Sequence, residues 1–330
     1  MDIKILTSMT KASVAYYYNE RKYLVLGTHN GVFHSDEVVA IAILCLYYEE
    51  HSIRIVRSRD DEDLDSCDIC VDIGGGEYDH HQPNFNLKRK NGIPFASAGL
   101  VWRTFGHKLI SNYLEKFFPE RVCLSSQIFN KFDEEVISLV DCEDNGIHTE
   151  KHCFSYIPSF LPLWTENRPD YDECFGEVLS ITIEIFKKEL FKTIQTVIAE
   201  KVLDESRKSI NLFKDNILKI PSQSIPWPQP IVEINNSVTL EEDLINFVIF
   251  QYPAGGWAAQ CVPPSLENGD KFKKRIPFPK EWAGLRDEEL AKVSTVKDAI
   301  FCHNGCFFVR AKTKEDVLQM CKIAMEKANT

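Results

Sequence analysis

The sequence predicts an α/β protein in which a parallel-sheet domain is joined by a helical spacer to a smaller α+β domain. Short apolar, strand-like runs alternate with helical segments in the first half of the chain, a pattern typical of parallel sheets with helical crossovers. Three clusters of histidine and acidic residues each follow an apolar run directly. A chain of 330 residues, 44% of them hydrophobic, is long enough for two cores.

The first half of the chain contains the elements of the expected parallel sheet. Residues 23–27 form a short apolar run and predict a buried strand, and residues 37–49 predict an apolar helix. Strands are expected again at 53–57, where polar and apolar residues alternate, and at 68–72. Residues 98–114 then have helical character. A further helix is expected at 134–140, just before the third cluster.

The second half begins with a helical pattern from Phe175 to about Leu218, which predicts either one long helix or two in succession. A proline-rich segment at 220–230 cannot continue a helix. Short strand-like runs and one final helix follow, at 231–234, 246–250, 257–262, 300–302, 306–309 and 314–328. We therefore expect two domains, at 1–205 and 206–330.

The three clusters combine imidazole and carboxylate side chains. They are His29-Asn-Gly-Val-Phe-His34-Ser-Asp36, Asp72-Ile-Gly-Gly-Gly-Glu-Tyr-Asp79-His80-His81 and Asp141-Cys-Glu-Asp144. In parallel α/β sheets ligands bind beyond the carboxyl ends of the strands, which is where the first two clusters would lie. A single histidine is usually structural, but three such clusters together predict a metal site.

Mixed histidine and aspartate ligands without thiolate favour Mn²⁺ over structural zinc, with Mg²⁺ as the alternative and one or two ions bound. A pair of ions needs a bridging carboxylate, and Asp72 is our candidate because it ends a strand. One ion would take His29, His34 and Asp72, and the other Asp36, Asp72, His80 and Asp141. Asp144 lies three residues beyond Asp141, on the same face of a helix, and is an equally placed ligand.

The remaining polar residues of the second cluster are candidates for catalysis and substrate binding. His81 is expected to contact phosphate or to protonate the leaving group as a general acid. Asp79 would assist catalysis by orienting an imidazole. Gly74, Gly75 and Gly76 lack side chains, so a substrate phosphate could approach their backbone N–H groups.

Composition restricts the classes of partner. A formal net charge of −11 argues against broad, nonspecific binding of nucleic acid. Two basic runs could still form a local basic channel, or they could be solvated loops: Lys88-Arg89-Lys90 and Lys271-Phe-Lys-Lys-Arg275. We expect the eleven cysteines to be reduced thiols. No apolar run is long enough to span a membrane and no signal segment is evident. The cytoplasm is therefore the default compartment.

The motifs quoted above resemble those of the DHH phosphoesterase superfamily, which includes RecJ-type exonucleases and manganese pyrophosphatases. The clusters, together with residues 97–102, 279–286 and 301–307, are more closely similar to the melanocyte-proliferating-gene family of exonucleases, formerly labelled metal-dependent protein hydrolases. One departure is that His34 occupies a position where the superfamily usually has an aspartate. A neutral ligand there makes the site less negative.

The resemblance implies a DHH-type catalytic domain, a C-terminal substrate-binding domain and 3′-to-5′ exonuclease activity on single-stranded RNA. It also implies that His303, Arg286 and Arg310 contact the substrate, and that mitochondria or the nucleus are alternative compartments. Two other functions stay open from the sequence. The same site could hydrolyse a small phosphate compound, such as pyrophosphate or a short oligonucleotide, or the protein could be a metal-binding regulator with little turnover.

Overall fold

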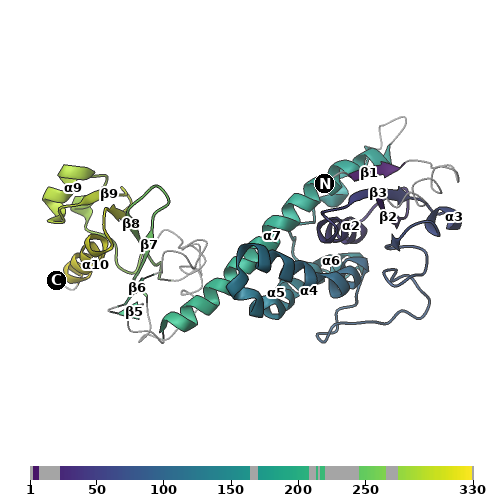
Figure 1. Cartoon of the computed structure of the whole chain (residues 1–330), viewed down its shortest axis with the longest axis horizontal. Coiled ribbons are helices and arrows are strands. Elements are labelled where there is room, and N and C mark those ends of the chain that lie inside the picture. Colours follow the sequence, from purple (N-terminus) through teal and green to yellow (C-terminus); the bar gives the residue numbers. More distant parts are fainter. Residues whose placement is uncertain are drawn as a thin grey trace. The chain divides into compact units, whose positions relative to one another are not determined.

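A computed structural model describes residues 3–6, 23–163, 170–207, 213–214, 216–219, 245–264 and 274–328. The chain divides into two compact units, Met1–Thr193 and Ile194–Thr330. This division lies within the long helix α7 (Tyr171–Arg207), and the boundary predicted at 205/206 lies farther along the same helix. The predicted α/β class is confirmed, since one sheet is parallel, the other is mixed, and both are accompanied by helices (Figure 1).

The first unit is built on a four-stranded parallel sheet. Its order is β1-β3-β2-β4, and the strands are β1 (Ile3–Leu6), β2 (Tyr23–Thr28), β3 (Ser52–Arg57) and β4 (Ile69–Cys70). Strands β2 and β3 pair in register from Tyr23↔Ser52 to Thr28↔Arg57. Because the strands are parallel, the residues that follow β2 and β4 emerge at the same edge of the sheet.

Strand β4 is shorter than the strand predicted at 68–72. Val71 makes only an isolated bridge with Tyr78, and Asp72 has a positive φ of 60° that no regular strand can accommodate. The chain therefore turns sharply at Asp72 and begins the loop that holds the second cluster.

Helices surround this sheet. Helix α2 (Ser35–Tyr47) is buried on nearly every side, because it packs against α4 (Ser97–Phe117) and also contacts residues 138–144 and 157–160. This explains its almost entirely apolar sequence, and both helices match the predicted ones closely. The shorter helical segments are α3 (Asp61–Leu64), η1 (Pro119–Leu124), α5 (Ser125–Phe132), the π-helical turn η2 (Asp133–Ile137), α6 (Ser138–Asp144) and η3 (Ile157–Phe160).

Helix α7 answers the question left open by the sequence, because its 37 residues form one helix rather than two. The predicted end near Leu218 is wrong, since the helix ends at Arg207 and residues 213–214 and 217–219 form strands. The N-terminal part of α7 belongs to the first unit. Phe186 contacts Trp102 of α4, with ring centroids 6.0 Å apart, and Phe175 contacts Phe33 in the loop of the first cluster, 5.7 Å away. Arg57 at the end of β3 donates a 2.7 Å hydrogen bond to Asp172. These contacts fix the start of α7 beside the first cluster.

The second unit contains a six-stranded mixed sheet with the order β5-β6-β7-β8-β10-β9. Among these described strands, only β6 and β7 pair in parallel. The helices and strands of the second unit after α7 are β5 (Phe213–Lys214), β6 (Ile217–Lys219), β7 (Phe247–Gln251), β8 (Trp257–Cys261), η6 (Lys280–Trp282), α9 (Asp287–Ser294), β9 (Ala299–Cys302), β10 (Phe308–Ala311) and α10 (Lys314–Ala328). Helix α10 has the predicted bounds.

Some expectations fall on residues that the structure does not describe. These are the proline-rich segment 220–230, the strand at 231–234 and most of the second basic run, including Lys271 and Lys273. Within the described ranges, no helix combines the length and apolar character needed to cross a bilayer.

Candidate metal centre

The first and second clusters meet at the carboxyl edge of the parallel sheet. His29 follows β2 directly, and Asp72 follows β4 after one residue. The first turn of α2 contributes Asp36 and Glu37, both of which are buried. Within the described residues, three groups of side chains place ligand atoms close enough together to hold a metal ion.

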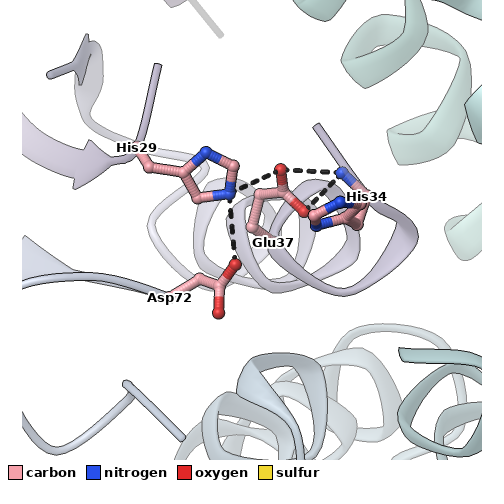
Figure 2. A group of neighbouring side chains, drawn as sticks. All are labelled: His29, His34, Glu37 and Asp72. Atoms are coloured by element: carbon pink, nitrogen blue, oxygen red, sulfur yellow. Dashed lines mark hydrogen bonds and ion pairs between the residues drawn. The ribbon is translucent and has the colours of Figure 1, made fainter. Parts of the chain in front are cut away.

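The first group consists of His29, His34, Glu37 and Asp72 (Figure 2). His29 Nε2 lies 3.2 Å from Glu37 Oε1 and 3.2 Å from Asp72 Oδ2. The other ring nitrogen, Nδ1, lies 3.2 Å from the carbonyl oxygen of Asn30, which helps to orient the ring. Both carboxylate oxygens of Glu37 accept hydrogen bonds from the His34 backbone N–H at 2.8 Å. The side chains therefore converge from a strand end, a helix start and a second strand end.

The other two groups, Asp72/His80/His81 and His34/Asp36/Asp144, are adjacent to each other. Three carboxylate oxygens surround His80 Nε2, at 3.1 Å from Asp144, 3.3 Å from Asp72 and 3.9 Å from Asp36. One ring nitrogen carries at most one proton, and it makes no well-aligned hydrogen bond here. This crowding of acceptors fits a cation bound among the same atoms.

Asp72 is shared between the two sides of the site. Its Oδ2 faces His29, while its Oδ1 lies 3.3 Å from His80 Nε2 and 3.2 Å from His81 Nδ1. Its side chain is only 1% exposed. A carboxylate that presents one oxygen to each of two ligand groups has the arrangement of a bridging ligand.

The electrostatics show why a cation fits. Burial raises the pKa of Asp36 well above its usual range, and the neighbouring carboxylates of Asp72, Glu37 and Asp144 raise it further. Asp36 Oδ1 is buried and accepts no hydrogen bond from the described residues. Divalent cations would neutralise this concentration of negative charge. The donor set fits a divalent metal, because it consists of imidazoles and carboxylates.

The same carboxylates raise the pKa values of His29 and His80. Burial lowers the pKa of His29, but its contacts with Asp72 and Glu37 outweigh burial and raise the pKa to about 9. Burial likewise opposes protonation of His80, yet Asp144 and Asp72 raise its pKa to about 10. Burial would raise the pKa of Asp72, but its close contacts with these two histidines hold it below the usual range. Both imidazoles are therefore protonated more readily than an ordinary histidine, because carboxylates lie beside them.

The structure distinguishes the two aspartates of the third cluster. Asp144, near the end of α6, belongs to a ligand group and contacts His80. Asp141 does not join a ligand group among the described residues. Its Oδ2 accepts a 2.6 Å hydrogen bond from Arg89, and its Oδ1 accepts a 2.9 Å bond from the Gly99 backbone N–H. We therefore replace Asp141 by Asp144 in the proposed ligand set, because the Asp141 carboxylate is already engaged.

The start of α4 supports the site in a way that the sequence did not reveal. The Ser97 hydroxyl donates to Asp72 Oδ1 at 3.1 Å, and the Ser97 backbone N–H donates to Asp36 Oδ2 at 3.3 Å. Together with Gly99, this first helical turn therefore contacts three aspartates. The N–H groups at the start of a helix have no partner within the helix, and together with the positive end of the helix dipole they stabilise carboxylates there.

His81 and Asp79 lie at the open side of the site. The side chain of His81 is 63% exposed, and its Nδ1 lies 3.2 Å from oxygens of both Asp72 and Asp79. Asp79 also accepts hydrogen bonds from the backbone N–H groups of His81, at 2.9 Å, and Gly75, at 2.8 Å. Asp79 thus holds the loop and the His81 ring together.

The glycine triplet is exposed. Gly74 and Gly75 have positive φ values of 83° and 64°, and a Cβ on Gly75 or Gly76 would meet no atom within 4 Å. The surface there is open to a ligand. The Gly75 N–H is nevertheless engaged by Asp79, so this amide serves the loop itself.

Sequence reasoning missed Glu37 and misjudged Arg89. Glu37 stands three residues after His34, the spacing of a capping box, and this signal could have placed its carboxylate beside the first cluster. Arg89 was considered part of a basic channel or a solvated loop. Its side chain is instead 7% exposed and binds Asp133 at 2.8 Å as well as Asp141.

The other predicted substrate contacts belong to the second unit. His303 is exposed in the turn between β9 and β10, where its Nδ1 accepts a 2.9 Å hydrogen bond from the Gly305 N–H. Arg286 precedes α9, and its guanidinium lies 4.5 Å from the centre of the Phe301 ring. The guanidinium of Arg310 on β10 lies 4.0 Å from the centre of the Tyr252 ring. These positions do not test the predicted contacts with the substrate.

Comparisons with known proteins give a consistent result. Residues 25–325 match the family model MYG1_exonuc, described as Uncharacterised protein family (UPF0160). The chain is 31% identical to human MYG1 exonuclease over 326 residues, which covers 91% of this chain and 85% of the relative. It is 30% identical to MYG1 protein C694.04c of Schizosaccharomyces pombe, covering 91% of this chain and 97% of the relative. No solved structure matches significantly. The chain therefore belongs to the MYG1 exonuclease family.

Proposed function

We propose that this protein is a metal-dependent phosphodiesterase that removes nucleotides from the 3′ end of single-stranded RNA, with Mn²⁺ as its metal. The observation that carries the proposal is the position of Asp72, whose two oxygens face two groups of histidine and acidic ligands. Such paired groups are typical of two-metal phosphoesterases.

Each residue of the site has a distinct part in this proposal. His29, His34, Glu37 and Asp72 would hold one ion, and Asp36, His80 and Asp144 would hold the other together with Asp72. When bound, two divalent cations would supply a nucleophilic water of lowered pKa and neutralise charge on the phosphoryl oxygens. Ser97 keeps Asp72 and Asp36 in place from the start of α4.

His81 is the proposed general acid. Asp72 and Asp79 engage its Nδ1, which leaves Nε2 of the exposed ring to reach a leaving group. Asp79 acts as a positioning residue, since it contacts both the His81 ring and the Gly75 amide of the open glycine loop.

Two further lines of support concern substrate and metal. Relatives such as the human protein are named exonucleases, which favours cleavage of phosphoester bonds at the end of a nucleic acid. RNA as substrate and the 3′-to-5′ direction come from the resemblance of the sequence motifs. The absence of thiolates from the proposed ligand set favours Mn²⁺ over zinc.

A sequencing gel with 5′-labelled single-stranded RNA tests this proposal, with the native protein compared with Asp72→Asn in Mn²⁺. Asparagine tolerates the positive φ of 60° at this position, so the substitution removes charge without adding backbone strain. The expected result is a ladder that shortens from the 3′ end with the native protein and not with the variant. Intact RNA with both proteins would contradict the exonuclease proposal.

A second candidate is hydrolysis of a small phosphate compound. It is favoured by the net charge of −11 and by the ion pairs of Arg89, which remove one cation from the expected basic channel. Cleavage of pyrophosphate or dinucleotides without cleavage of longer RNA would support this candidate. Activity that persists as RNA length increases would exclude it as the main function.

A further inference from the structure

The sheet of the second unit has two different faces. Helix α10 packs against β7, β8 and β10 (Figure 1). The side chains beneath it are buried and apolar, among them Phe247, Ile249, Ala259, Val309 and Ala311. Successive strand residues point to opposite faces, so the residues between these belong to the other face.

Strand register identifies the residues of that other face. Arg310 of β10 is paired with Phe301 of β9 on one side and with Ala258 of β8 on the other. Phe308 lies two residues before Arg310 and therefore shares its face. Arg286 makes an isolated bridge with Phe301, which places it beside β9.

Aromatic rings are concentrated on this face. The ring of Phe308 lies 6.5 Å from Phe301 and 5.9 Å from Tyr252, measured between centroids. All three rings are partly exposed. Phe250 of β7 belongs to the same face, 6.4 Å from Phe308, but it is buried. The exposed part of the face is therefore the part that Tyr252, Phe301 and Phe308 form.

Two arginines lie over these rings. The Arg286 guanidinium is 4.5 Å from the centre of Phe301, and that of Arg310 is 4.0 Å from the centre of Tyr252. Arg310 also donates a 3.0 Å hydrogen bond to the Gly255 carbonyl oxygen. In the described part of the chain, neither guanidinium forms an ion pair with a carboxylate. Among the described residues, these two charges are therefore not paired with an acid.

We propose that this surface, the aromatic face (Tyr252, Arg286, Phe301, Phe308 and Arg310), binds single-stranded RNA by stacking its unpaired bases. Phenylalanine and tyrosine rings stack on any base, and guanidinium groups both stack and contact phosphate. Bases within a duplex are already stacked, so the face favours single strands. The choice of RNA rests on the proposed function. The inference adds that substrate bases are recognised by stacking and without sequence preference.

Fluorescence anisotropy of the full-length protein with a short labelled oligouridylate tests the inference. Excess EDTA in the assay prevents metal-dependent hydrolysis, so binding is measured alone. The informative variants are Phe301→Leu and Phe308→Leu, because leucine retains apolar bulk but removes the ring. The matched control is Phe117→Leu, which alters a ring that is 50% exposed on α4 of the first unit. An abasic ribose-phosphate chain of equal length reports how much of the affinity depends on bases.

We expect each aromatic-face variant to bind oligouridylate about 5- to 100-fold more weakly than the native protein, and the control to bind normally. The abasic chain should bind the native protein more weakly by at least the same factor. Three results would overturn the inference: no binding of oligouridylate, equal binding of the abasic chain, or native affinity in both variants. Normal binding without hydrolysis on the sequencing gel would instead defeat the proposed exonuclease activity and leave the aromatic face intact as a binding surface.

Discussion

Asp141 and Asp144 show how far residue types alone can assign a metal site. Both follow an apolar helical segment, and their spacing gives neither an advantage. The structure separates them through Arg89, which donates a hydrogen bond to Asp141 and lies in a loop 52 residues away in the sequence. Sequence spacing could not reveal this pairing, because it depends on tertiary contacts. By contrast, the positions of His29 and Asp72 at strand ends were predictable from hydrophobic pattern.

At Asp141, substitution by asparagine should mainly reduce stability. The change leaves the buried Arg89 guanidinium with less compensating charge, and breaking a buried pair costs about 3–5 kcal/mol. Urea denaturation of the native protein and Asp141→Asn measures the difference. A variant as stable as the native protein would show that the Arg89–Asp141 contact is not important for the fold.

Asp144→Asn should reduce activity and leave stability nearly unchanged. Its carboxylate is partly exposed and contacts His80 within the proposed ligand set, so stability should change by no more than about 1 kcal/mol. Hydrolysis of RNA in Mn²⁺ should fall by about 100-fold or more, since a direct ligand is lost. Full activity in this variant, measured in the same assay as Asp141→Asn, would remove Asp144 from the site.

Among the elements around the site, we expect the first turn of α4 to tolerate substitution least. A Cβ on Gly99 would lie 1.9 Å from Asp141 Oδ2 and 2.7 Å from Arg89 Nη2. Gly99→Ala should therefore destabilise the protein by about 1–3 kcal/mol through overpacking, although alanine is normally the better helix former. Thermal denaturation followed by circular dichroism measures this effect.

Gly176→Ala in α7 is the matched control for Gly99→Ala. Its Cβ would meet only the flexible end of Ile5, 2.9 Å away. This substitution should be close to neutral. Equal melting temperatures for the two variants would contradict the argument that the N-terminus of α4 is held in place by Asp141 and Arg89.

The elements themselves were largely predictable. Apolar periodicity located α2, α4 and α10 because each buries a wide face or, for α2, nearly its whole surface. Strand β1 was not predicted, since a four-residue run such as Ile3–Leu6 carries little pattern and gains its structure by pairing with β3. Strand β4 was predicted too long, because nothing in the sequence indicated the positive φ at Asp72.

For the whole molecule, the acidic cluster at the sheet edge links metal binding to stability. Burial and mutual repulsion of carboxylates destabilise the metal-free fold, as the raised pKa of Asp36 indicates. Mn²⁺ should therefore raise the melting temperature of the native protein, by an amount equivalent to about 2.7 kcal/mol at a hundred times the dissociation constant. Differential scanning fluorimetry with Mn²⁺, followed by EDTA, should show a reversible shift. No shift at millimolar Mn²⁺ would contradict metal binding by the folded chain.

The central claim is that Asp72 joins two metal sites, and the number of Mn²⁺ ions bound per chain tests it most directly. Isothermal titration of the metal-free, full-length protein should give two ions per chain. In Asp72→Asn, whose fold is checked by circular dichroism, we expect at most one weakly bound ion, because both ligand groups lose an anionic oxygen. Two ions bound with native affinity by the variant, or none bound by the native protein, would contradict the account.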